Sequence, residues 1–243
     1  MYSFDTATAR PVAQASVSER LAFLQRVYGW MTAALLMTAV GAGISIQTGL
    51  TERAFMFSNS FMGAILIMLA WMGMGWGLMK VRHMQGVNVI AFAAYSLFTG
   101  FVLSGIIFVA MLMARQLGQS SMTYVWQALG LTTVTFGGLT AYTFFTKRDF
   151  SFLAGMLTVA TWGFLGVMLL SFFFQSTGFA LLISFFGVVL FAGWILFDTQ
   201  RIMREYPTNE HVAASFTLYL NFVNLFVNIL RIILLLAGGG RRD

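Results

Sequence analysis

The sequence contains no cysteine and few charged residues, and both absences limit what the protein can be. Without cysteine there are no disulfides, thiolate metal ligands or cysteine nucleophiles. Only 9% of the 243 residues are charged, whereas a water-soluble chain carries about a quarter. Histidine is equally scarce, since the chain has only His83 and His211, which leaves little for a metal cluster. Apolar residues make up 59% of the chain, so we expect its natural solvent to be a lipid bilayer.

Charges are absent from six long stretches, and these stretches predict the membrane spans. A helix needs about 20 apolar residues to cross the hydrocarbon core of a bilayer. The longest stretch, 150–197, would be roughly 72 Å long as one helix, more than twice the core thickness, and it contains a polar turn at 175–178. We therefore predict two helices there, and an all-α membrane protein of one domain, 1–243, with seven transmembrane helices. The predicted spans are 27–50, 59–79, 86–113, 124–146, 152–174, 178–206 and 211–237.

The basic residues predict which side of the membrane each loop occupies. With a cytoplasmic N-terminus, nine Lys and Arg fall on the inner side and four on the outer side, as the positive-inside rule requires. Topology therefore accounts for the net charge of +6 without a nucleic-acid partner. Seven crossings place the Arg241-Arg242 tail outside, against this trend, and a re-entrant seventh segment is the alternative.

The two ends of the chain are predicted to be short tails. Residues 1–18 are expected to form a disordered cytoplasmic tail, and 238–243 a short C-terminal tail that follows the last helix. No cleavable signal peptide is expected, because the first apolar stretch is too long for one.

One acidic and several polar side chains remain at membrane depth. Asp198 is the carboxylate farthest from any predicted membrane surface, and a charge at the bilayer centre costs about 3 kcal/mol even on insertion scales. In the last helix, polar residues recur at spacings that place them on one face; they are Thr217, Asn221, Asn224, Asn228 and Arg231. We expect this stripe to line a hydrated cavity or to hydrogen-bond neighbouring helices as structural support, and Arg231 alternatively to snorkel.

Asp198 and Asn221 are predicted to lie at one depth. Asp198 is nine residues before Pro207, in the turn between the last two helices, and Asn221 is ten residues after His211. At 1.5 Å per residue both lie roughly 14 Å from the turn, so the two side chains can face each other. Asp198 is therefore the candidate functional residue, and a neutralised or lysine-paired structural acid is the alternative.

The same residues argue against an enzyme. An intramembrane aspartyl protease needs two carboxylates that share a proton, and only one lies at depth here. The Gly-x-Ser-x-Gly motif of serine hydrolases is absent. A metal shared by His83 and His211 is not expected, because neither histidine has acidic residues at a spacing that would place them on the same helix face. We expect no catalytic residues.

Two segments near the end of the chain form a distinctive pattern. They read Leu-Phe-Asp-Thr-Gln-Arg at 196–201 and Leu-Tyr-Leu-Asn-Phe-Val-Asn-Leu-Phe at 218–226, closing on Leu230 and Arg231. This pattern resembles the signature of the Bax inhibitor-1 family, also called the transmembrane Bax inhibitor motif family. The resemblance implies a bacterial inner-membrane member whose seventh helix lies at the centre, wrapped by two layers of three helices.

The resemblance also implies functions and site residues. Family members are associated with a pH-sensitive calcium leak, with protection from cell death in eukaryotes, and in some bacteria with restraint of a membrane-bound AAA protease. In calcium-leak members two membrane aspartates pair, and a basic residue at the end of the second helix latches the first. Asp198 matches the first aspartate, and Lys80 is the nearest match to the latch, a lysine where arginine is expected. Asn221 stands where the second aspartate should be.

This amide changes the expected chemistry. Two adjacent carboxylates share a proton and titrate as a pair, and calcium prefers several hard oxygens. One carboxylate beside an amide therefore implies a blunter pH switch and at most a weak, transient calcium contact at Asp198, with no other cofactor.

Three hypotheses remain open at this point. The leading one is an ion leak or ion sensor in which Asp198 is the titratable gate, Lys80 its closed-state partner and Asn221 a polar ligand. The alternative is a non-transporting interaction protein that restrains a membrane-bound AAA protease. A proton-coupled transporter is the third.

Overall fold

A computed structural model describes residues 10–58, 60–174 and 176–239 of the chain. The regular structure of these residues is helical, apart from an isolated antiparallel bridge between Pro11 and Pro207. The elements are η1 (Val12–Gln14), α1 (Val17–Gln47), α2 (Leu50–Ser58), α3 (Phe61–Lys80), α4 (Val87–Gln116), α5 (Thr123–Phe145), α6 (Leu153–Leu170), α7 (Thr177–Arg204) and α8 (His211–Gly239).

Seven helices, α1 and α3 to α8, are long and apolar enough to cross a membrane. This confirms the prediction of an all-α membrane protein with seven spans. The break inside the 48-residue uncharged stretch is also confirmed, because the Ser176 side chain accepts a hydrogen bond from the backbone N–H of Phe179 and caps α7. The short helix α2 was not predicted. It is too short to span the membrane, and it contains Glu52 and Arg53.

The start of α1 corrects the prediction for the N-terminal region. The helix begins ten residues earlier than the apolar stretch, because Ser16 and Glu19 form a reciprocal capping box. Residues 10–16, which we call the N-terminal arm, are also ordered, whereas a disordered tail was predicted over 1–18. The backbone N–H of Val12 donates to the Tyr206 carbonyl at 2.9 Å, and Val12 is buried. The rest of that predicted tail, residues 1–9, lies outside the described residues.

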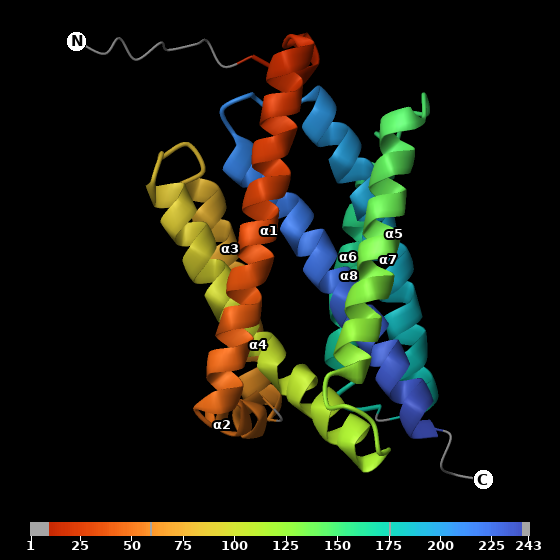
Figure 1. Cartoon of the computed structure of the whole chain (residues 1–243). Coiled ribbons are helices and arrows are strands. Elements are labelled where there is room, and N and C mark those ends of the chain that lie inside the picture. Colours follow the sequence, from red (N-terminus) through yellow and green to blue (C-terminus); the bar gives the residue numbers. More distant parts are fainter. Residues whose placement is uncertain (1–9, 59, 175, 240–243) are drawn as a thin grey trace.

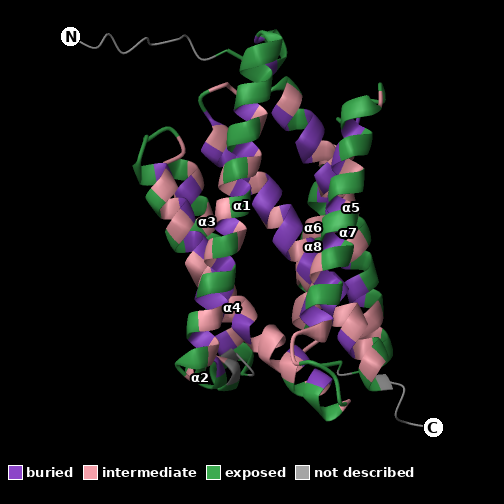
Figure 2. Cartoon of the chain, in the orientation of Figure 1, coloured by how far each residue is buried: buried purple, intermediate pink, exposed green. Residues whose placement is uncertain are grey.

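Helix α8 lies at the centre of the bundle (Figure 1). It packs against α1, α4, α5 and α7, and 44% of its membrane-spanning window is buried, against 33% or less for the other six spans. Figure 2 shows buried residues along most of α8, up to its last turns, with α1, α3 and α4 on one side and α5, α6 and α7 on the other. The central position implied by the family resemblance is therefore confirmed. α8 also crosses the full bundle, so the re-entrant alternative is wrong.

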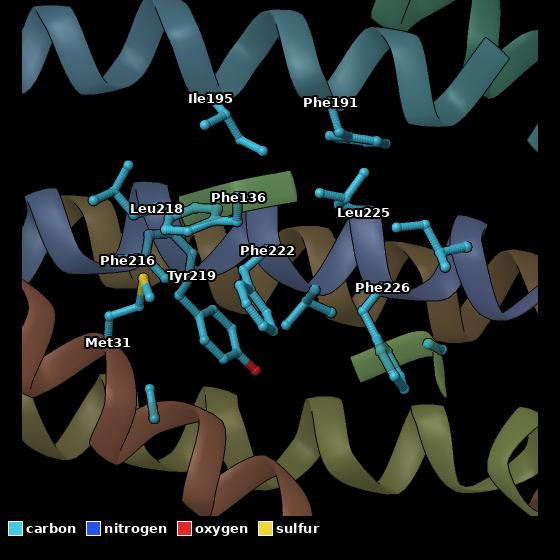
Figure 3. Close-up of a cluster of buried hydrophobic side chains, with 14 of the residues drawn as sticks. Met31, Phe136, Phe191, Ile195, Phe216, Leu218, Tyr219, Phe222, Leu225 and Phe226 are labelled. Atoms are coloured by element: carbon cyan, nitrogen blue, oxygen red, sulfur yellow. The ribbon is translucent and has the colours of Figure 1, made fainter. Parts of the chain in front are cut away.

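The side chains of α8 form two faces (Figure 3). Leu218 and Leu225 point toward α7, while Tyr219, Phe222 and Phe226 point toward α1 and α4. The Tyr219 hydroxyl lies 2.6 Å from the Thr38 hydroxyl of α1, which satisfies both buried groups.

Small residues hold α1 against α4. A Cβ atom at Gly41 would collide with the backbone of Leu97, and one at Gly100 would collide with the backbone of Thr38. Lipid tails are as apolar as leucine, so close backbone contact of this kind stabilises a membrane bundle where the hydrophobic effect cannot.

One end of the bundle gathers the N-terminal arm and three loops, 81–86, 146–152 and 205–210 (Figure 1). We call it the arm end. The opposite end contains α2 and the end of α8.

Candidate functional site

The structure brings Asp198 and Asn221 together between α7 and α8. The Asn221 Nδ2 atom donates a hydrogen bond of 2.7 Å to Asp198 Oδ2. Both residues are only 5% exposed. Asn221 lies on the same face of α8 as Leu218 and Leu225, which point toward α7. Asp198 and Asn221 therefore lie at the same depth in the α7–α8 hairpin, as the sequence predicted. The amide of Asn221 supplies the hydrogen-bond donor that a buried carboxylate requires.

Tyr206 and Thr217 lie on the arm-end side of this pair. Their hydroxyl groups are 3.2 Å apart and link the turn after α7 to α8. Burial raises the pKa of Tyr206, so its phenol stays protonated. Arg201 is exposed and lies one turn of α7 after Asp198. Its Nε atom pairs with Glu205 Oε2 at 3.3 Å, and its Cζ atom lies 5.9 Å from the centre of the Tyr206 ring.

No ion pair reaches Asp198 from the residues described. The other acids of the arm end each have a basic partner within 4 Å: Glu19, Asp149, Glu205 and Glu210. Asp198 instead has the neutral amide of Asn221. The site is therefore one carboxylate held by a neutral donor.

Lys80 does not contact Asp198, and this corrects the closed-state partner expected from the family pattern. It ends α3, is exposed, and places its Nζ atom 4.9 Å from the centre of the Trp76 ring. The physical reason is the position of α3, which packs against α2 and α4 at the edge of the bundle. A lysine there keeps its charge in a polar environment while its stem covers the aromatic ring.

The polar stripe of α8 divides into two kinds of residue. Thr217 and Asn221 bond to groups of the turn and of α7, whereas Asn224 and Asn228 donate 2.8 Å hydrogen bonds to carbonyls of their own helix. The Asn228 side chain also lies directly on Gly187 of α7, where a Cβ would collide with it. Asn228 therefore fits the expected structural role in helix contact. Arg231 is partly exposed, and its guanidinium has no hydrogen bond or ion pair within residues 10–239 as described.

A calcium contact at Asp198 would have few protein ligands. In the described part of the chain no group of three or more His, Cys, Asp or Glu converges on one point. Asn221 is engaged as a donor to the carboxylate. Calcium takes 6–8 oxygen ligands in well-formed sites, so the protein groups at Asp198 do not form such a site.

Two contacts of the arm end were missed by sequence reasoning. Gln200 joins α7 to the loop after α5, because its Oε1 accepts from the Phe150 N–H at 2.7 Å and its Nε2 donates to the Arg148 carbonyl at 2.7 Å. Glu210 is buried and pairs with Arg82 and His83 of the α3–α4 loop. Gln200 lies in the motif that contains Asp198, which was a usable signal; nothing in the sequence indicated the partners of Glu210.

Comparison with known proteins agrees with this architecture. Residues 20–239 match the family model described as "Inhibitor of apoptosis-promoting Bax1". The chain is 34% identical over 226 residues to Bax inhibitor 1 of Schizosaccharomyces pombe, which covers 92% of this chain and 80% of that protein. It is 33% identical over 222 residues to the Golgi anti-apoptotic protein of Vaccinia virus (91% and 89% covered), and 28% identical over 224 residues to the inner membrane protein YbhL of Escherichia coli (86% and 90% covered). With its seven apolar helices and its central α8, the chain belongs to the Bax inhibitor-1 family of multi-pass membrane proteins.

Proposed function

We propose that this protein is a pH-sensitive cation leak of a bacterial inner membrane, with its N-terminus in the cytoplasm and Asp198 as the gate. The observation that carries the proposal is the buried Asp198–Asn221 hydrogen bond, which has no ionic partner. The name of the E. coli relative, an inner membrane protein, supports the location. The nine basic residues on the arm-end side support the orientation.

The gate would act through the contact between α7 and α8. An ionised Asp198 accepts a charge-assisted hydrogen bond from Asn221, and such bonds are about twice as strong as neutral ones. Protonation removes that charge and weakens the link between the two helices at this depth. Tyr206 and Thr217 then form the remaining polar contact between the site and the arm end. Cations entering from that end would follow the polar face of α8, with protons and calcium as the candidate ions.

Lys80 has no part in this mechanism. Its charge lies over Trp76 at the edge of the bundle, so release of the gate depends on Asp198 and Asn221 alone. Because the site has one carboxylate, we expect calcium to bind weakly and to permeate rather than to stay bound.

Reconstitution in liposomes with calcium and proton indicators tests the proposal. We expect flux that rises as the arm-end pH falls, and loss of that pH dependence in Asp198→Asn, which keeps the side-chain shape but has no titratable group. Asp149→Asn is the matched control, because Asp149 is an exposed acid of the same end.

Two results would count against the gate. If Asp198→Asn kept the full pH dependence, the assignment of Asp198 would be wrong. If the purified wild-type protein carried no flux at all, and a membrane-bound AAA protease co-purified with both wild type and Asp198→Ala, the protein would be an interaction partner instead of a leak.

A further inference from the structure

A small cavity at the arm end of α3 is lined almost entirely by basic and aromatic side chains. It measures about 340 Å³ and is formed by Trp76, Met79, Lys80, Arg82 and His83. These residues end α3 and begin the loop to α4, and no residue of the Asp198 site contributes to the cavity.

The charges of the cavity are only partly balanced. Glu210 is the acid that faces it: its Oε2 lies 3.6 Å from Arg82 Nε and its Oε1 lies 3.2 Å from His83 Nδ1. Arg82 Nε also donates to His83 Nε2 at 3.0 Å. Lys80 has no carboxylate partner among the residues described, and its ammonium group faces the Trp76 ring. The cavity therefore has a positive excess that suits an anion.

The position of the cavity selects the kind of anion. Trp76 is 68% exposed and continues a row of exposed apolar side chains on one face of α3 that would face lipid: Leu66, Leu69 and Met72. Tryptophan is enriched at the level of the lipid headgroups. Basic pockets at the ends of membrane helices, on the side rich in lysine and arginine, bind anionic headgroups. A lipid with its tails along α3 would place its headgroup at Lys80.

We propose that this cavity binds the headgroup of an anionic phospholipid. Lys80 and Arg82 contact the phosphate, Trp76 and Met79 cover the glycerol region, and the bound anion competes with Glu210 for Arg82 and His83. Since Glu210 directly precedes α8, the lipid loosens the link between the α3–α4 loop and the central helix.

Native mass spectrometry of the full-length protein tests this inference. The protein is released from detergent micelles that contain equal amounts of phosphatidylglycerol, whose headgroup carries a net negative charge, and phosphatidylcholine, whose headgroup is zwitterionic. We expect several-fold preferential retention of phosphatidylglycerol. Each basic side chain near an anionic lipid surface contributes about a fivefold effect, so K80A and R82A should each lower the preference about fivefold, while K80R keeps it.

Lys147→Ala is the matched control, because Lys147 is an exposed lysine of the same end on a different loop. Equal retention of the two lipids by the wild type would overturn the proposal, as would an equal loss in Lys147→Ala and K80A. Displacement of phosphatidylglycerol by millimolar inorganic phosphate would also overturn it, since the site would then bind a soluble anion.

The competition with Glu210 has its own test. E210Q removes the rival charge and should raise retention of phosphatidylglycerol a few-fold above wild type. Unchanged or lower retention, in a variant that is folded at the temperature of the measurement, would contradict the competition.

Discussion

Asp198 and Glu210 are two carboxylates buried to nearly the same degree, 5% and 8% exposed, and they are satisfied in opposite ways. Asp198 accepts a hydrogen bond from a neutral amide inside the helical bundle. Glu210 lies at the arm end and pairs with Arg82 and His83, which are 41% and 60% exposed. A neutral partner places no opposite charge beside a buried acid, whereas a basic partner holds one within a few ångströms of it. The first arrangement suits a switch, and the second suits a link between two segments.

The largest effect should come from removing the partner of Asp198. Asn221→Leu leaves a buried carboxylate without its donor, at a cost of about 3 kcal/mol. We expect a clear fall in the thermal unfolding midpoint in detergent, measured by circular dichroism. Asn221→Gln, which retains an amide, is the control and should fall less. A midpoint equal to wild type in Asn221→Leu would mean that the hydrogen bond contributes nothing to the contact between α7 and α8.

Removing the charge of Glu210 should have a smaller effect on stability. Arg82 and His83 can be hydrated once Glu210→Gln releases them, because both are well exposed, so we expect a loss of about 1 kcal/mol. The same thermal measurement applies, with Glu205→Gln as the control for an exposed ion pair. A loss as large as that of Asn221→Leu would show that the two acids are equivalent, contrary to the comparison above.

The smallest effect should be at Asp149, an exposed acid. The backbone N–H of Ser151 and the nearby Arg204 hold the pKa of Asp149 below its usual value of 3.8. A lowered pKa in the folded state contributes stability above the unfolded value, and that contribution is lost as the pH falls. Asp149→Asn should therefore match wild type at acid pH and be slightly less stable above about pH 4. A variant that was less stable only in acid would contradict this sign.

The sequence was informative where a property repeats along the chain. Gaps between charges located the seven spans, since crossing a bilayer excludes charge over a fixed length. Counting outward from Pro207 placed Asp198 opposite Asn221, because a helical hairpin has few possible registers. The short helix α2 and the ordered N-terminal arm were missed, since neither is long or apolar enough to stand out.

The contacts of Lys80 and Glu210 depend on how the helices pack, and the sequence did not predict them. Lys80 was expected at Asp198 only through the family pattern, and the edge position of α3 separates them. Likewise, Glu210 meets Arg82 and His83 across two loops that are distant in the chain. No local spacing encodes such a contact.

Exchanging the two residues of the pair tests the central claim most directly. The double variant Asp198→Asn with Asn221→Asp keeps one acid and one amide in contact but moves the acid from α7 to α8. In the liposome assay, we predict that Asp198→Asn alone carries flux without pH dependence and that the exchanged pair restores it. Full pH dependence in Asp198→Asn alone would contradict the account.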